Sequence, residues 1–261
     1  MKLNEFCELM ESIAPKALAL DFDNVGLLVE LDHDEIKKVL VALDLTLPVA
    51  EEAIAGGYDL VLTHHPIFFE PLRSFPAHAP ETAAAYALIR HGIGHFAAHT
   101  NLDACAGGVN DVLSDMLSLT DVRPLPPENF GRIGRLEKPM PFSAFAALCE
   151  TLFRTKGRFV GEPDRLIETV AVVGGSGGSE VDFVHDAGCD VYVTGEIKHN
   201  HALAVRHYGF NCCVMGHYET EFPVLKPLIT RLQNANKGVQ YDLTHAGSAP
   251  LRCLEGGHFN E

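Results

Sequence analysis

Short apolar runs alternate with helical segments along most of this chain, and this alternation restricts the fold more than any other feature. In the first half, runs at 38–45, 60–64 and 94–99 are separated by helical patterns at 47–56 and 80–91. Runs of Val and Leu without a polar residue at every second position are typical of strands that helices bury on both faces. The pattern predicts an α/β fold with mostly buried sheets and helices packed outside.

The same rhythm returns in the second half, after a proline-rich stretch that interrupts it. The remaining elements are expected as strands at 26–29, 168–173, 190–194, 211–215 and 239–243, and as helices at 3–14, 108–118, 142–154, 199–208 and 220–234. We therefore expect a first α/β lobe at 1–120, a connecting subdomain at 121–165 and a second α/β lobe at 166–261.

The composition restricts the partners and the compartment. The 35 Asp and Glu residues outnumber the 20 Lys and Arg residues, and a net charge of −15 repels phosphate, which makes duplex nucleic acid a poor partner. The 7 cysteines, Cys253 among them, form no C-x-x-C pair, which indicates reduced thiols. The sequence shows neither a secretory leader nor an apolar run of membrane-spanning length. We expect a cytoplasmic protein without a membrane partner.

The histidines fall into two groups by position. Those that stand apart from any strand end are interpreted as surface or structural residues: His33, His78, His91, His185, His207 and His258. His64 and His65 instead follow a buried run and precede Pro66. Neighbouring side chains on extended backbone point in opposite directions, so we expect each ring to bind a different metal ion.

Two further polar clusters follow expected strands. Asp103 comes shortly after the run at 94–99, and its two oxygens could bridge two ions; by itself it would be interpreted as a turn cap. His217 and Glu221 follow the run at 211–215 and, four residues apart, share one helical face.

Sites in open α/β sheets form beyond the carboxyl ends of the strands. The sequence therefore predicts a metal site whose ligands are His64, His65, Asp103, His217 and Glu221. Nitrogen and oxygen ligands without Cys indicate an open site and not a closed structural zinc. Glu196, in another loop after a strand, and His99 are the candidate proton carriers. The alternative for Glu196 is an ordinary helix start.

One motif competes with the metal site. The segment 174–178 matches G-x-S-x-G, the pattern of a serine nucleophile elbow, and Asp190 and His217 follow in hydrolase order. Glycine-rich loops meet so short a pattern by chance, and it leaves the other histidines unexplained. A serine hydrolase using Ser176 is the remote alternative, and an anion held by the backbone N–H groups of this loop is another.

Taken in order, these residues resemble a known family. The matching segments are Asp23–Leu27, Leu62–Pro66, His99–Asp103, Gly107–Asp111, Val173–Gly177, Thr194–Glu196, and Gly216 and His217 with Glu221. They are similar to the NIF-three-like family of dinuclear-metal proteins, often labelled GTP cyclohydrolase type 2 homologues. That family usually has a tryptophan before its Asp-Asn-Val-Gly segment, where this chain has Phe22.

The resemblance implies two intertwined α/β lobes and a toroidal homohexamer with metal pairs that face an inner cavity. It implies the same ligands that the residues indicate by themselves. It also makes the loop at 174–178 a structural or binding element of the fold. The stretch 121–165 is too short for the extra domain of some members, which indicates the compact form.

Two functional hypotheses follow. In the first, two divalent ions per chain serve a metal-dependent hydrolase that acts on a small molecule or nucleotide, by ring opening or by related C–N or phosphoester hydrolysis. In the second, the chain is a non-enzymatic metal-binding oligomer that stores, delivers or senses metal or serves as a scaffold. Imidazole and carboxylate ligands suit Zn, Fe, Mn and Ni alike.

Overall fold

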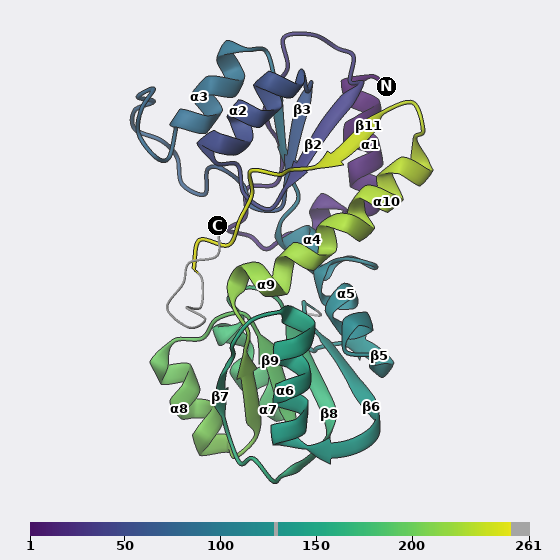
Figure 1. The fold of residues 1–261 in the computed structure, drawn as a ribbon, viewed down its shortest axis with the longest axis vertical. Helices are drawn as coiled ribbons and strands as arrows, with labels where there is room; N and C mark the ends of the chain where they lie inside the picture. The colour runs from purple at the N-terminus through teal and green to yellow at the C-terminus, as the bar shows by residue number, and fades with distance from the viewer. Residues whose placement is uncertain (128–129, 252–261) are drawn as a thin grey trace. The chain divides into compact units, whose positions relative to one another are not determined.

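A computed structural model describes residues 1–127 and 130–251 and divides the chain into two compact units (Figure 1). Unit 1 comprises Met1–Gly108 and Val224–Ser248, and unit 2 comprises the described residues of 109–223 and 249–251. Cys253, His258 and the end of the expected second lobe lie outside the described residues. Each unit has its own sheet and is described by itself.

Unit 1 is built on a mixed sheet with the strand order β1-β4-β3-β2-β11. Its strands are β1 (Gly26–Val29), β2 (Lys38–Ala42), β3 (Leu60–Thr63), β4 (Gly94–Ala97) and β11 (Gln240–Leu243). β2, β3, β4 and β11 are parallel, and β1 joins β4 antiparallel. Because β3 and β4 are parallel neighbours, the segments that follow them leave the same edge of the sheet.

Helices cover both faces of this sheet (Figure 1). The elements are α1 (Leu3–Ile13), η1 (Lys16–Leu18), α2 (Leu47–Gly56), α3 (Ala83–Arg90), α4 (Thr100–Ala104) and α10 (Leu225–Ala235). α2 and α3 pack on the face that carries Leu40 and Val61. α1 packs on the opposite face, where the ring of Phe6 meets Phe96 edge-on at 5.6 Å between centroids. Burial on both faces explains the nearly continuous apolar strands.

Unit 2 has a second mixed sheet with the strand order β5-β6-β8-β9-β10-β7. Its strands are β5 (Thr120–Pro124), β6 (Arg132–Pro141), β7 (Arg158–Val160), β8 (Leu166–Val173), β9 (Val191–Thr194) and β10 (Asn211–Val214). β8, β9 and β10 are parallel, whereas β5, β6 and β7 pair antiparallel. The helices are α5 (Val109–Met116), α6 (Phe142–Phe153), η2 (Gly178–Glu180), α7 (Val181–Asp186), α8 (His199–Tyr208), α9 (His217–Glu221) and η3 (Phe222–Val224).

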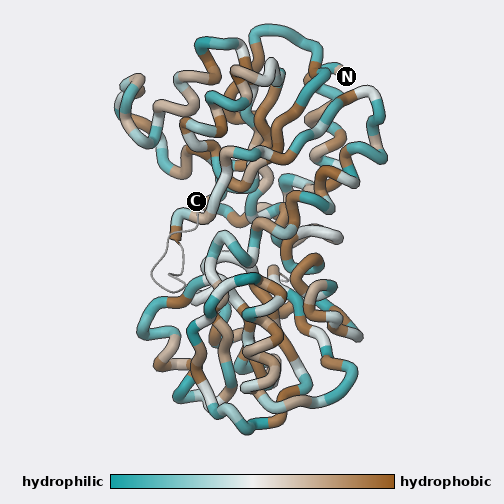
Figure 2. Tube along the Cα trace, viewed as in Figure 1, coloured by the Kyte–Doolittle hydropathy of each residue, from teal (hydrophilic) through white to brown (hydrophobic). Residues whose placement is uncertain are grey.

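One part of the core of unit 2 lies on the face of the sheet that α7 and α8 cover. Ala171, Tyr192 and Cys212 stand in register on three neighbouring strands and contact Val184 and Val205 of these helices. Figure 2 shows the most hydrophobic parts of the trace concentrated in the central strands of each unit. The α/β fold with buried strands that the sequence predicts is confirmed.

The boundaries differ from the expected lobes in three places, the first being α5 (Val109–Met116), which was expected in the first lobe, 1–120, and belongs to unit 2. The stretch 121–165, expected as a connecting subdomain, supplies β5, β6, α6 and β7 to unit 2. Its prolines suggested a connector, but Pro124 lies in an edge strand, and Pro139 lies at an irregularity in the pairing of β6 with β8, where a missing N–H is tolerated. The expected second lobe, 166–261, also included α10 and β11, but the chain returns to unit 1 for both; this return is what intertwined lobes require.

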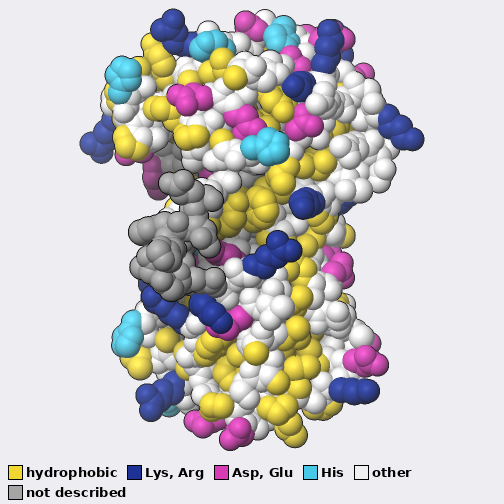
Figure 3. Space-filling model, viewed as in Figure 1, with side chains coloured by type: hydrophobic (Ala, Val, Ile, Leu, Met, Phe, Trp, Pro, Cys, Tyr) yellow, Lys and Arg dark blue, Asp and Glu magenta, His cyan; other side chains and the backbone are white. Residues whose placement is uncertain are grey.

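The surface bears on the expected partners. No described helix is both long and apolar enough to cross a bilayer. On the face drawn in Figure 3, Lys and Arg side chains of the described residues are dispersed among Asp and Glu side chains.

Candidate metal centre

His64 and His65 lie where the chain leaves β3, and their rings converge. The N–H groups of His64 and His65 still donate to Ala42 and Leu43 of the neighbouring strand, at 3.3 and 3.0 Å. The backbone bends at both residues, however, and the ring centroids lie 4.9 Å apart at an angle of 51°. The expectation that the rings point in opposite directions is therefore wrong, because it assumed extended backbone beyond Thr63.

A buried polar relay holds this bend. The Thr63 hydroxyl donates to the carbonyl oxygen of His65 at 2.6 Å and lies 2.8 Å from Nε2 of His95. Since the hydroxyl proton goes to His65, the Nε2–H group of His95 is the donor to Thr63. Burial lowers the pKa of His95 to about 3, which keeps this ring neutral.

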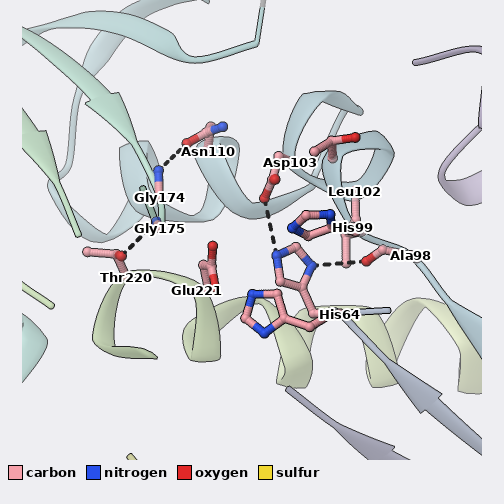
Figure 4. A network of polar contacts seen from close by, with 12 residues as sticks. His64, Ala98, His99, Leu102, Asp103, Asn110, Gly174, Gly175, Thr220 and Glu221 are labelled. Carbon is pink, nitrogen blue, oxygen red and sulfur yellow. Dashed lines mark hydrogen bonds and ion pairs between the residues drawn. The ribbon is translucent and has the colours of Figure 1, made fainter. Parts of the chain in front are cut away.

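His64 is buried and has an oxygen near each ring nitrogen (Figure 4). Its Nδ1–H donates to the carbonyl oxygen of Ala98 at 2.9 Å, and its Nε2 lies 3.5 Å from Oδ1 of Asp103. Asp103 stands in the first turn of α4, and its backbone N–H donates to His99 at 3.0 Å. Strand β4 and the helix that follows it therefore place both partners of His64.

The rings of His65 and His99 are each oriented by a carboxylate that was not among the residues predicted for the site. Nδ1 of His65 lies 2.7 Å from Oδ1 of Asp44, and Nδ1 of His99 lies 2.9 Å from Oδ1 of Asp23. Burial of Asp23 favours its neutral form, but hydrogen bonds from His99 and Thr100 outweigh burial and lower its pKa to about 2. Asp44 follows β2 as the histidines follow β3 and β4, and that position was the available signal.

In unit 2, the short helix α9 carries the expected pair. Nε2 of His217 lies 3.0 Å from Oε2 of Glu221, one turn further along the helix. Nδ1 of His217 lies 3.6 Å from Oε2 of Glu196, whose side chain is 51% exposed. Glu221 is buried, while His217 is one-third exposed. Unit 2 therefore presents an imidazole and a carboxylate on one helical face, with a second carboxylate at the rim.

The glycine loop supports this helix. Figure 4 shows the N–H of Gly174 donating to Oδ1 of Asn110 and the N–H of Gly175 donating to the Thr220 hydroxyl, at 2.9 and 3.0 Å. A Cβ atom at Gly175, where φ is +62°, would overlap the Glu221 carboxylate. The N–H of Gly177 donates to Thr194 at 3.2 Å. Side chains of unit 2 accept the hydrogen bonds of these three N–H groups, so the groups are engaged within the protein. This favours a structural role for the loop over the binding of an anion.

The same geometry argues against a serine triad. Ser176 is exposed and makes no hydrogen bond within the described part of the chain. Asp190 accepts hydrogen bonds from the N–H groups of Glu168 and Thr169, which ties β9 to β8 and not to a histidine. His217 faces carboxylates at both nitrogens.

The donor sets suit a divalent cation. In unit 1, one ring nitrogen of each of His64, His65 and His99 lies within 4.8 Å of the other two. In unit 2, His217 and Glu221 form a second, two-donor set. Imidazole and carboxylate donors without thiolates are those of open sites for borderline metals. The side chains that the sequence predicted as ligands thus stand in two oriented groups, one in each unit.

Comparisons with known proteins place the chain in a family. The model of the family Duf34/NIF3 (NGG1p interacting factor 3) matches residues 1–249. A Clostridium perfringens protein named GTP cyclohydrolase 1 type 2 homolog is 35% identical over 235 residues, which cover 86% of this chain and 88% of the relative. NIF3-like protein 1 of Drosophila melanogaster is 32% identical over 231 residues, 84% of this chain and 78% of the relative.

Solved structures give the same result for the fold. A hypothetical protein of Staphylococcus aureus superimposes with a TM-score of 0.89 at 28% identity, covering 97% of this chain and 99% of that one. Reduced HcgD from Methanocaldococcus jannaschii superimposes with a TM-score of 0.82 at 31% identity, covering 93% of this chain and 97% of that one. The chain belongs to the Duf34/NIF3 family.

Proposed function

We propose that this chain holds two divalent metal ions on His64, His65, Asp103, His217 and Glu221 and acts with them as a hydrolase. The observation that carries the proposal is that each unit holds a buried carboxylate beside the Nε2 atom of an imidazole. His64 Nε2 lies 3.5 Å from Asp103 Oδ1, and His217 Nε2 lies 3.0 Å from Glu221 Oε2. Both carboxylates are buried, and a buried carboxylate is stabilised by a cation beside it.

The chemistry of the site divides between metal and side chains. Divalent ions supply Lewis-acid chemistry, because they make water more acidic and polarise carbonyl, imine or phosphoryl groups. Glu196, half exposed beside His217, accepts or returns a proton at the solvent side. His99, with Nδ1 held by Asp23, is the second proton carrier. The buried carboxylates of Asp103 and Glu221 serve as ligands in this proposal.

The names of the relatives support a substrate class. Relatives that cover most of this chain are named GTP cyclohydrolase 1 type 2 homologs. We extend that chemistry to this chain as nucleotide ring opening or a related hydrolysis of a C–N or phosphoester bond. The donor set suits Zn, Fe, Mn or Ni.

Elemental analysis and a turnover screen test the proposal. Native protein is expected to carry two divalent ions per chain, and His65→Ala and Glu221→Ala are each expected to lower that number. His78→Ala, an exposed histidine, is the matched control and keeps both ions. Metal-loaded protein is then given nucleotides, phosphoesters, peptides and cyclic amides, with chelated protein as the blank. Native protein without metal contradicts the proposal.

A second function is favoured by the burial of the ligands. The side chains of His64, Asp103 and Glu221 are 0%, 6% and 4% exposed, which suits retention of a metal more than exchange of substrates. In this alternative, the chain is a non-enzymatic metal-binding oligomer for storage, delivery, sensing or scaffolding. Two bound ions without any metal-dependent product across the screen favour this function.

The oligomeric state and the cellular compartment of the protein are further proposals. We propose a homohexamer, which native mass spectrometry tests directly. We also place the protein in the cytoplasm, supported by Cys149, Cys189, Cys212 and Cys213, which are buried thiols.

A further inference from the structure

Two exposed cations of unit 2 have no part in the proposed metal centre. Arg158 begins the edge strand β7, and Lys198 directly precedes α8. Both side chains are exposed, and within the described part of the chain neither forms an ion pair with a carboxylate. In a chain with a net charge of −15, two such cations at one end of a sheet attract an anion from solution.

The register of β7 places Arg158 at the end of the sheet that also leads into α9. β7 runs antiparallel to β10, and Arg158 stands opposite Val214, the last residue of β10. His217, the first residue of α9, follows Val214 by three positions. A Cβ atom at Gly157 would lie 2.7 Å from Sδ of Met215, so the turn before β7 contacts the segment between β10 and α9.

Arg158 and Lys198 share one face of this sheet. Opposite residues of an antiparallel pair point to the same side, so Arg158 projects on the face of Val214. Val214 packs against the core under α7 and α8, and so does Ile197, the residue before Lys198. α8 also packs against β7 (Figure 1). Because Lys198 follows the carboxyl end of β9, the two cations lie on the same face and at the same end of the sheet.

The turn that carries Arg158 is held in place by a neighbouring carboxylate. Glu150 accepts hydrogen bonds from Nζ of Lys156 at 2.8 Å and from the N–H of Gly157 at 3.2 Å. Glu150 therefore neutralises Lys156, whereas the charge of Arg158, two residues later, has no carboxylate beside it among the described residues. A backbone fixed in this way lowers the entropy cost of binding a ligand through Arg158.

The chemistry of the two cations suits a phosphate group. A guanidinium binds phosphate through two parallel N–H groups, and an ammonium binds it as a compact charge. The cations also adjoin the donors of unit 2 along the chain, since Glu196, two residues before Lys198, lies 3.6 Å from Nδ1 of His217. A nucleotide has its anionic phosphates at one end and its hydrolysable ring at the other, which matches cations placed to one side of metal ligands.

We propose that Arg158 and Lys198 bind the phosphate of a nucleotide substrate. This inference rests on the proposed function and restricts its substrates to phosphorylated nucleotides. The ordinary alternative is that Arg158 prevents the edge strand β7 from pairing with other chains and that Lys198 is only solvated.

Titration calorimetry of the metal-free chain with pyrophosphate tests the inference, because chelation removes any contribution of metal to phosphate binding. The native chain is expected to bind pyrophosphate, and Arg158→Gln and Lys198→Gln are each expected to weaken that binding by about 10-fold, as loss of a charged hydrogen bond does. Arg206→Gln removes one charge from an exposed position of α8 and is the matched control. Arg158→Lys keeps the charge and is expected to bind more tightly than Arg158→Gln.

Competition identifies the source of the phosphate. GTP is expected to displace pyrophosphate, whereas guanosine, which has no phosphate, is not. Added salt is expected to weaken binding to the native chain more than binding to the Arg158→Gln/Lys198→Gln double variant, because the interaction is electrostatic.

Three outcomes overturn the inference: a native chain that does not bind pyrophosphate, equal effects of Arg158→Gln and Arg206→Gln, and failure of GTP to displace pyrophosphate. None of them changes the metal content expected for the proposed function. Conversely, native protein without metal contradicts the proposed function, but it leaves pyrophosphate binding by the metal-free chain as a separate result.

Discussion

The two units hold their donors by different means. In unit 1, His64, His65 and His99 come from two strand ends, and each ring is fixed through Nδ1 by an oxygen from another segment. In unit 2, His217 and Glu221 come from one helix of 5 residues, and His217 is one-third exposed. Unit 1 therefore depends on tertiary contacts to orient its donors, whereas unit 2 depends mainly on helical spacing.

The donor side chains of unit 1 are pre-organised by contacts around them, whereas those of unit 2 are placed by the geometry of one short helix. A ring fixed on several sides loses little freedom when a ligand binds, and its geometry survives without the ligand. A helix this short is unstable by itself and relies on the glycine loop and Thr220 for support. We therefore expect removal of metal or of single side chains to affect the two units unequally.

The largest expected difference is between His64→Ala and His217→Ala in the metal-free protein. Removing a buried ring leaves a cavity, so we expect His64→Ala to lower the free energy of unfolding by about 3 kcal/mol. His217 is partly exposed, and its removal is expected to cost less than about 1 kcal/mol. Urea unfolding measures both losses. Equal losses would contradict the inferred difference between the two units.

Removal of metal is the next largest effect. Saturating metal at about 100 times the dissociation constant stabilises a folded protein by about 2.7 kcal/mol. Chelation is therefore expected to lower the Tm by roughly 5–10 °C. Hydrogen exchange should rise more at 217–221 than at 60–65. Greater exchange in unit 1 would contradict its pre-organisation.

Loss of an outer carboxylate should weaken metal binding less than loss of a ligand. Asp44→Ala removes the oxygen that orients His65, and we expect a 10- to 100-fold weaker zinc affinity, by the rule of roughly that size for outer partners. Asp32→Ala, at an exposed carboxylate, is the control. Unchanged affinity after Asp44→Ala would show that the ring of His65 is oriented by other contacts.

The Thr63 relay offers a smaller and more specific test. Thr63→Val removes the hydroxyl that bonds His65 and His95, and it is expected to lower the free energy of unfolding by about 1 kcal/mol. Thr63→Ser keeps the hydroxyl, so we expect it to bind zinc more tightly than Thr63→Val does. A loss of packing alone would not produce this difference between the two variants. Equal zinc affinities of the valine and serine variants would show that the hydrogen bonds of the Thr63 hydroxyl do not affect zinc binding.

The smallest effect is expected at the exposed rim of unit 2. Glu196→Gln removes a charge 3.6 Å from His217, but its side chain is 51% exposed and solvent weakens the interaction. We expect zinc affinity to change by less than about fivefold. A change as large as that of Asp44→Ala would show that both units use strong outer carboxylates. A loss of turnover without loss of metal would instead support its role as a proton carrier.

Much of the fold follows from local patterns in the sequence. The sequence predicts strands close to β3, β4 and β10 and helices close to α2 and α8, because apolar periodicity reflects burial on one or two faces. It does not predict β6, whose second half is mostly exposed and whose prolines are tolerated only because of the pairing around them, or the short, mostly exposed β7. The expected helix at 220–234 is interrupted near Pro223, where α9, η3 and α10 follow one another.

The sequence by itself determined which side chains are candidate ligands, because their chemistry and their positions after strands are local properties. The four-residue spacing of His217 and Glu221 is local as well. Only the tertiary structure decided that the rings of His64 and His65 converge, that His99 joins them, and that Asp23 and Asp44 orient two of the rings. These depend on a backbone bend and on contacts between segments distant in the chain, and no short-range pattern specifies either.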